Sequence, residues 1–327
     1  MSPFTLSDSI ESSPRTIRST LAAWRLLASL LLLSGCGSDA GVGPDASEDL
    51  EIVQARSETG ASADVDLYLM RADGTSGRRL TGMFGVEFFP EWSPDGRQVL
   101  FARLADDRQW LVDSDGSGLR TLETRPSDNA RWSPDGAWIV FHRVLGAITS
   151  ELVVMHPDGS GERSVTRGLV SQPYGAPSWS ADGRIAFRRG DGMSGIWTVK
   201  SDGSTLAQLT ADPGDQMPRW SRDGTHLALQ SGVVISQGWR QPIAVVNADG
   251  SGRRVLTTPG ASDVDQNPTW SPDGEWILFE RQSYQSSTPM CALMKVSMSS
   301  GASVVVRTPS PGLCFGASWR PAGSGAW

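Results

Sequence analysis

The amino-acid sequence predicts an all-β protein, a six-bladed β-propeller of four-stranded antiparallel blades. The first observation is a pentapeptide, Trp-Ser-Pro-Asp-Gly, that occurs at Trp92, Trp132 and Trp270 and returns with one change at Trp179 and Trp220. The second is an Asp-Gly motif that recurs between these copies. The third is the spacing: successive copies lie about 40 to 50 residues apart, which is typical of propeller blades.

The pentapeptide predicts the corner of a hairpin. Proline in the second position and glycine in the last position of Ser-Pro-Asp-Gly favour a type I turn. Strand-like segments follow the turns, for example "RQVLFAR" at 97–103 and "EWILFER" at 275–281. We expect the tryptophans to pack between blades. Four copies have a proline two residues before the tryptophan, as suits an innermost strand with one unpaired edge: Pro90, Pro177, Pro218 and Pro268.

The Asp-Gly motif predicts a second hairpin in each unit, because Asp-Gly between two apolar runs is a strong hairpin signal. "LYLMRADGTSGRRLT" at 67–81 and "IAVVNADGSGRRVLT" at 243–257 are two of its copies, and a sixth copy at 293–308 has lost the Asp-Gly. Each unit therefore holds four strands: one that ends at the tryptophan, one after the first turn, and one on either side of Asp-Gly.

The two ends of the repeat array are out of phase with the blades. The array begins with Leu50–Arg56, which is a second strand, and ends with a worn copy, "WRPAG", at Trp319, which supplies only a first strand. We therefore expect the sixth blade to be completed by N-terminal strands that pair with the C-terminal strand. Such closure removes exposed strand edges.

These repeats resemble those of the TolB-type propellers, a WD-like family that carries W-S-P-D-G and D-G-S-G. The resemblance covers nearly all of residues 50–327. It implies a six-bladed propeller in the bacterial cell envelope. TolB proper carries an additional N-terminal domain, whereas in this chain we expect a lipobox and a short tether before the propeller, so contact with the peptidoglycan-associated lipoprotein is not carried over.

The N-terminal region predicts export and lipid anchoring. Residues 1–35 contain three arginines followed by the apolar run Leu26–Leu33, which is too short to span a bilayer and is typical of a signal peptide. "LSGC" then resembles a lipobox, so we expect Cys36 to be lipidated, and Gly37 after it suits the outer membrane. Residues 36–49 are small and polar and predict a flexible tether to a propeller at 50–327. We expect an exported protein, anchored in the outer membrane and facing the periplasm or the cell surface.

Charge and cysteine content narrow the function further. The chain has 29 basic and 36 acidic residues, a formal net charge of −7, and no basic stripe, which argues against nucleic acid as a partner. Three cysteines are present. With Cys36 lipidated, Cys291 and Cys314 remain, either as a disulfide, as is common in exported proteins, or as two free thiols.

No catalytic motif is recognisable, and we expect the protein not to be an enzyme. The sequence contains no G-x-S-x-G, no C-x-x-C and no Gly-Lys pair of a phosphate loop. Its histidines, His142, His156 and His226, fall in different units, which does not suggest a metal site or Ser-His catalysis.

One end of the predicted ring collects polar and aromatic residues. Because adjacent strands run antiparallel, the starts of the first strands meet the ends of the second strands at the same mouth. The candidate residues near the strand starts are Glu87, Asp128, Tyr174, Asp215, Gln216, Asp265, Asn267 and Phe315. The candidates at the strand ends are Arg56, Arg103, Arg143, Arg189 and Arg281.

Two interpretations of these residues remain open. Arginines and carboxylates could pair from blade to blade, each exposed pair contributing about 0–1 kcal/mol. They could also form a binding face, since propellers carry function on their loops. We predict no cofactor and no metal; the alternative is Ca²⁺ held by Asp215, Asp265 and amide oxygens, because hard cations take several oxygen ligands.

The preferred hypothesis for function is a lipid-anchored binding or scaffold module that presents a polar propeller mouth to an envelope protein, peptide or glycan. The alternative is a metal-dependent hydrolase or lyase that uses the channel mouth. A purely architectural spacer is the third possibility. Fold alone does not decide among them.

Overall fold

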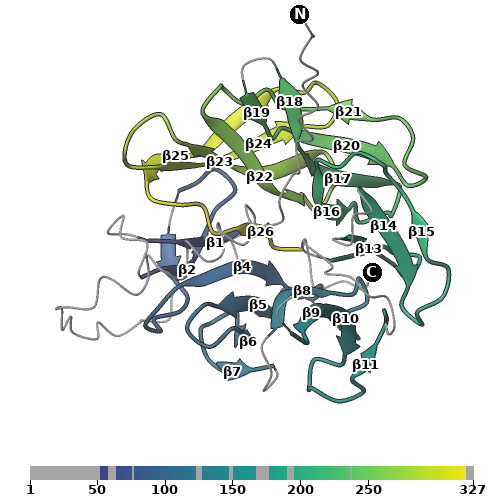
Figure 1. Cartoon of the computed structure of the whole chain (residues 1–327). Helices are drawn as coiled ribbons and strands as arrows, with labels where there is room; N and C mark the ends of the chain where they lie inside the picture. The colour runs from purple at the N-terminus through teal and green to yellow at the C-terminus, as the bar shows by residue number, and fades with distance from the viewer. Residues whose placement is uncertain are drawn as a thin grey trace, which may run out of the picture. The chain divides into compact units, whose positions relative to one another are not determined.

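The computed structural model describes residues 52–57, 64–75, 77–122, 127–146, 150–166, 177–189, 195–235 and 238–321, with only the backbone described at 128 and 233–240. All of them belong to one compact unit, Asp45–Trp327. The described residues form six four-stranded antiparallel sheets arranged around a central axis (Figure 1), which confirms the predicted fold class. The predicted signal peptide, the tether and Cys36 lie outside the described residues.

Five blades follow one another along the chain, each with its first strand innermost. Adjacent inner strands contact one another around the ring. The strands of the first three of these blades are β4 (Glu87–Trp92), β5 (Gln98–Arg103), β6 (Arg108–Asp113) and β7 (Arg120–Thr121); β8 (Ser127–Trp132), β9 (Ile139–Val144), β10 (Ser150–Met155) and β11 (Arg163–Ser164); and β12 (Ser178–Trp179), β13 (Arg184–Arg188), β14 (Ile196–Lys200) and β15 (Ala207–Gln208).

The next two blades depart from this pattern in length. The first contains an extra hairpin between its second and third strands, and the second has the longest strands of the described ring. Their strands are β16 (Asp215–Trp220), β17 (His226–Ser231), β20 (Ile243–Asn247) and β21 (Arg254–Val255), with the hairpin β18 (Val233–Ile235) and β19 (Gly238–Arg240); and β22 (Asp263–Trp270), β23 (Trp276–Ser283), β24 (Met290–Ser297) and β25 (Ser303–Pro311).

The remaining blade joins strands from both ends of the described chain. Its order is β26 (Ala317–Trp319), β1 (Ile52–Arg56), β2 (Asp66–Met70) and β3 (Gly77–Arg79). β26 and β1 pair antiparallel, with Ile52 opposite Trp319 and Gln54 opposite Ala317, and the two strands lie side by side in Figure 1. Cys291 and Cys314 form a disulfide that ties β24 to the segment leading into β26.

The core consists of apolar clusters between neighbouring blades. In one cluster, Leu100 and Leu111 of one blade pack against Trp132, Phe141 and other residues of the next. Equivalent clusters lie at the following junctions. Five of the six motif tryptophans, Trp132, Trp179, Trp220, Trp270 and Trp319, take part in them, so these indoles are directed toward a neighbouring blade. Because side chains alternate along a strand, the residue just before each tryptophan points the other way, into the channel.

The pentapeptide forms the same hydrogen-bonded corner in different blades. The Ser93 hydroxyl donates to Asp95 Oδ1 at 2.6 Å and accepts from the Gln98 backbone N–H at 2.9 Å. Asp95 Oδ1 also accepts from the Arg97 N–H at 3.1 Å. Gly96 ends the corner at φ 67°, a conformation that favours glycine. The copies at 133–138, 221–226 and 271–276 repeat these bonds.

A bulge shapes the inner strands three residues before the tryptophan. Phe89, Asn129, Met217 and Asn267 all have φ between 50° and 55°, and the strand pairing slips there. Non-glycine residues rarely adopt this conformation, and bulges redirect the side chains that follow them. The bulge therefore sets the direction of the channel-facing residue. In the part of the chain that the structure describes, no helix is long and apolar enough to cross a membrane.

Candidate functional site

The ring has two mouths. We call the end where the inner strands begin the strand-start mouth, and the end formed by the Trp-Ser-Pro-Asp-Gly corners the tryptophan mouth. The candidate residues from the sequence were all expected at the strand-start mouth.

Three of the carboxylates expected at the strand-start mouth are fully buried. Glu87, Asp215 and Asp265 each have 0% exposure. Glu87 accepts hydrogen bonds from the Leu67 N–H at 3.2 Å and from the Thr81 hydroxyl, both in the neighbouring blade. Burial raises the pKa of Glu87 to about 8. We expected these carboxylates to be exposed at the mouth. The structure corrects this expectation, because all three are buried and accept hydrogen bonds from other groups of the protein.

At the strand-start mouth, the arginine–carboxylate pairs of the described candidate residues form within blades. Arg281 binds Asp265 through two hydrogen bonds, Nε to Oδ1 at 2.6 Å and Nη2 to Oδ2 at 2.8 Å, between adjacent strands β23 and β22. Asp215 accepts from Arg253 of its own blade. These two pairs lie within a blade, so the interpretation that arginine and carboxylate pair from blade to blade is wrong for them.

The other candidates are also engaged in local contacts. Two of the arginines lie over aromatic rings, Arg56 over Tyr68 and Arg189 over Trp197. Arg103 donates to the Phe84 carbonyl and forms an ion pair with Asp106. Arg143 forms an ion pair with Glu162. Asn267 donates to Glu280, the carbonyl of buried Phe315 accepts from the Phe89 N–H, and Gln216 is partly buried on β16. Tyr174 and the side chain of Asp128 lie outside the described residues.

The carboxylates considered for calcium are held by guanidinium groups. A cation between Asp215 and Asp265 would face Arg253 and Arg281, which already bind their oxygens. Among the described residues, the one cluster with the composition of a metal site is Glu280, Cys291 and Cys314, and its two cysteines form the disulfide.

The larger cavity of the described ring opens at the other end, at the tryptophan mouth. It has a volume of about 150 Å³ and is lined by residues from all six blades. Its walls are the six motif tryptophans, and prolines of the corners surround its entrance. Trp92, Trp132 and Trp220 are at most 8% exposed, whereas Trp179 and Trp319 are partly exposed. The tryptophan mouth is therefore a narrow pocket on the ring axis.

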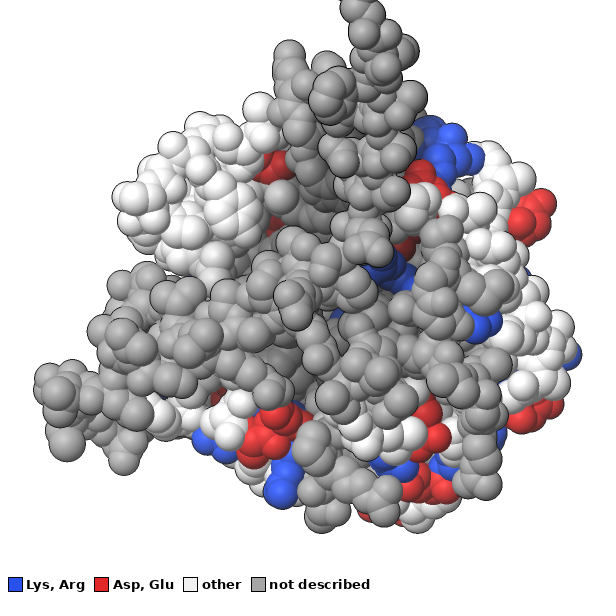
Figure 2. Space-filling model, in the orientation of Figure 1, with Lys and Arg blue, Asp and Glu red and all other residues white. Residues whose placement is uncertain are grey.

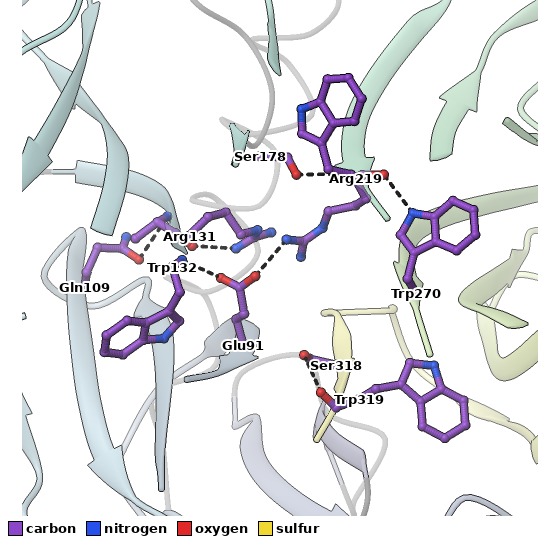
Figure 3. Close-up of polar contacts among 11 residues, drawn as sticks. Glu91, Gln109, Arg131, Trp132, Ser178, Arg219, Trp270, Ser318 and Trp319 are labelled. Atoms are coloured by element: carbon purple, nitrogen blue, oxygen red, sulfur yellow. Dashed lines mark hydrogen bonds and ion pairs between the residues drawn. The ribbon is translucent and has the colours of Figure 1, made fainter. Parts of the chain in front are cut away.

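The floor of this pocket is a layer made by the residue just before each tryptophan. We call it the channel layer; its members are Glu91, Arg131, Ser178, Arg219, Thr269 and Ser318. Arg219 Nη1 pairs with Glu91 Oε1 at 3.1 Å, across the channel from the opposite blade. Glu91 Oε2 also accepts from the Trp132 N–H at 3.1 Å (Figure 3). The ion pair separates the pocket from a smaller cavity on the strand-start side, lined in part by Phe89 and Met217.

Arg131 is the second cation of the channel layer. It is buried, its Nη1 donates to its neighbour's carbonyl, that of Ala130, at 2.7 Å, and in Figure 3 its guanidinium and that of Arg219 point toward one another. Burial, with a contribution from Arg131, lowers the pKa of His142 to about 3. His142 is therefore neutral at physiological pH and adds no charge to this region.

Further polar groups complete the layer. The Ser178 hydroxyl accepts from the Trp220 N–H at 2.9 Å, and the Arg219 carbonyl accepts from the Trp270 indole N–H at 2.8 Å (Figure 3). Because the Ser178 oxygen is the acceptor in its bond, its own proton can be donated to a ligand.

The pocket is positively charged in an acidic protein. Arg131, Arg219 and Arg222 line it together with one carboxylate, Glu91, which gives a formal charge of +2, whereas the whole chain carries −7. On the surface visible in Figure 2, acidic and basic side chains of the described residues lie interspersed rather than in separate patches. The side chains that line the pocket are therefore positive on balance, while the aspartates of the corners around it carry negative charge.

Sequence reasoning missed the channel layer. A signal was present: strand alternation places the residue before a core tryptophan on the opposite face of the strand. In the six copies this position is Glu, Arg, Ser, Arg, Thr and Ser, so comparison of the repeats treats it as variable.

A family comparison identifies the class of protein. The model of the family described as PD40, TolB beta propeller domain, matches residues 42–223 of this chain, which is more than half of it. The chain therefore belongs to the TolB-type propeller family. The resemblance seen in the sequence is confirmed, and family membership fits a binding or scaffold role.

Sequence identity to individual relatives is low. The chain is 27% identical over 206 residues to the uncharacterized peptidase YuxL of Bacillus subtilis (strain 168), covering 58% of this chain and 28% of that protein. It is 30% identical over 168 residues to the protein TolB homolog of Chlorobium luteolum, covering 48% of this chain and 37% of that protein. The chain thus spans about a third of these two relatives, and their activities are not transferred to it.

Solved structures share the fold. TolB from Acinetobacter baumannii superposes with a TM-score of 0.68 at 17% identity, over 83% of this chain and 67% of that chain. A TolB-like structure from Agrobacterium tumefaciens gives 0.64 at 19% identity, over 84% and 95% of the two chains. At these identities the similarity extends to the fold alone.

Proposed function

We propose that this chain is a binding module of the cell envelope, exported and lipid-anchored through Cys36, that takes an envelope protein, peptide or glycan at a propeller mouth. Membership of the TolB-type family and the similarity to TolB-named proteins support an envelope role. The signal-peptide and lipobox pattern of the sequence supports the anchor.

The observation that carries the proposal is the pocket at the tryptophan mouth. It is concave, lies on the ring axis, and brings charged and hydroxyl groups from different blades to one place. Binding sites combine an apolar wall with a few convergent polar groups in this way. At the strand-start mouth, by contrast, the candidate carboxylates Glu87, Asp215 and Asp265 are buried, and the last two are paired with arginines. We therefore assign the partner to the tryptophan mouth.

The hydrolase or lyase alternative has no comparable support. The carboxylates available for it at the strand-start mouth, Asp215 and Asp265, are held by arginines. The peptidase-named relative is matched over 28% of its length.

Capture of partners from detergent-solubilised envelope extracts tests the proposal. Arg222 lies at the tryptophan mouth and is partly exposed, so Arg222→Glu reverses a charge there without opening the core. Arg103→Glu makes the same charge change at the strand-start mouth and is the matched control. We expect Arg222→Glu to lose the partners that wild type and Arg103→Glu retain. Loss in the Arg103 variant alone would place the binding face at the strand-start mouth and contradict the assignment.

A further inference from the structure

We propose that the pocket at the tryptophan mouth binds a carboxylate, the free carboxyl terminus of a peptide. This inference rests on the proposed function and gives it a ligand class. Three features of the pocket lead to it: its charge, its dimensions and the arrangement of its hydrogen-bond donors.

Charge selects an anion. The pocket carries a formal charge of +2 from three arginines and Glu91, in a chain with a net charge of −7. A positive cleft with low-dielectric walls concentrates anions, and the indole walls supply such an environment. His142, which lies behind the layer and is held neutral by its lowered pKa, neither adds to this charge nor offsets it.

The dimensions select a small end group. A cavity of about 150 Å³ accommodates a group of roughly benzene size. One terminal amino-acid residue fits this limit, whereas the interior of a folded partner does not. A sugar ring would require an exposed aromatic face for stacking. Four of the six tryptophans are at most 9% exposed, and the partly exposed Trp179 and Trp319 are packed against apolar clusters between blades. The pocket therefore favours a peptide terminus over a glycan.

The donors match a carboxylate. Arginine binds carboxylates through paired N–H donors, and the guanidinium groups of Arg131 and Arg219 in the channel layer point toward one another (Figure 3). Arg219 Nη1 already donates to the carboxylate of Glu91 at 3.1 Å, so this guanidinium binds a carboxylate at this position. An incoming carboxylate would compete with Glu91 for Arg219, and the Ser178 hydroxyl can donate to it.

This competition can be tested, because substitutions of Glu91 and Arg219, the two members of the ion pair, should change the affinity for a carboxylate in opposite directions. Calorimetric titration of the purified full-length protein would use N-acetyl-trialanine with a free carboxyl terminus, and the same peptide with a C-terminal amide. We expect the free acid to bind at least about tenfold more tightly than the amide. Glu91→Gln should tighten binding of the free acid about threefold or more, because it removes the internal competitor. Arg219→Gln should weaken it at least about tenfold.

The controls separate this inference from folding and from the proposed function. Arg103→Gln removes one positive charge, as Arg219→Gln does, but at the strand-start mouth, and it should leave the affinity for the free acid unchanged. A gain of affinity in Glu91→Gln cannot arise from misfolding. Equal binding of acid and amide, no binding of either, or weaker binding by Glu91→Gln would overturn the inference. If envelope partners still depend on Arg222 in that case, the proposed function stands and the ligand class alone is wrong.

Discussion

Arg219 and Glu91 lie 128 positions apart in the chain and in opposite blades, yet their side chains meet across the channel at 3.1 Å. The two groups are largely buried, with side-chain exposures of 14% and 18%. Burial lowers the pKa of Arg219, and the carboxylate of Glu91 counters that effect. The pair closes the channel and forms the floor of the pocket at the tryptophan mouth.

The ion pair predicts non-additive effects on stability. Glu91→Gln leaves the Arg219 charge without this carboxylate in a largely buried place, which should lower the free energy of unfolding by about 1–3 kcal/mol. Glu91→Gln combined with Arg219→Gln removes both charges and should cost less than the sum of the two single changes. Urea unfolding of the four proteins measures this. Strictly additive values would contradict a direct interaction.

Glu87 predicts a pH dependence of stability. Its folded pKa is raised from 4.5 to about 8 by burial, so the folded state holds a proton that the unfolded state releases. The contribution of Glu87 to the free energy of unfolding is fully present below about pH 4.5 and is lost as the pH rises through about 8. Glu87→Gln keeps an acceptor for Leu67 and cannot ionise, so the variant should gain up to about 4 kcal/mol over wild type at pH 9 relative to pH 5. Unfolding free energies at both pH values check this, and an equal difference between the proteins at both would contradict it.

The pairing of β26 with β1 predicts sensitivity to C-terminal truncation. Ending the chain after Thr308 removes β26 together with the end of β25 and Cys314 of the disulfide, and it leaves the edge of β1 without its partner. We expect the melting temperature to fall by about 5 °C or more. Ending the chain after Pro321 keeps β26 and serves as the control. A truncated protein with the same melting temperature as the wild type would show that the pairing of β26 with β1 does not hold the ring closed.

The proposed lipid anchor predicts the cellular fraction of a single variant. Cys36→Ala removes the sulfur that the lipobox would modify, and the exported protein should move from the membrane to the soluble fraction. Cell fractionation with immunoblotting measures this. Cys314→Ala, which changes a cysteine of the disulfide, should stay with the membrane. Membrane association that survives Cys36→Ala would refute the anchor.

The fold could be predicted from sequence because many copies obey the same packing. Each Trp-Ser-Pro-Asp-Gly forms the same corner, and five of the six motif tryptophans join clusters between blades, so repetition revealed the architecture. The pocket depends on what differs among the copies. Glu91 and Arg219 occupy the same position in two blades and carry opposite charges, and no spacing along the chain shows that they meet.

Burial at the strand-start mouth was not predictable for a related reason. Glu87 looks like a polar residue at a strand start, but Leu67 and Thr81 of the neighbouring blade cover it and bind it. That contact depends on how two units pack side by side. The alternation of side chains along β4 would have indicated that Glu91 faces the channel, since Trp92 next to it lies in the core.

Site-specific photo-cross-linking in intact cells tests most directly whether the tryptophan mouth is the binding site. A photoreactive amino acid would replace Arg222 at the tryptophan mouth in one strain and Phe84 near the strand-start mouth, where it is 72% exposed, in another. We predict covalent adducts to an envelope partner from position 222 and none of the same partner from position 84. Adducts from position 84 with none from position 222 would contradict the central claim.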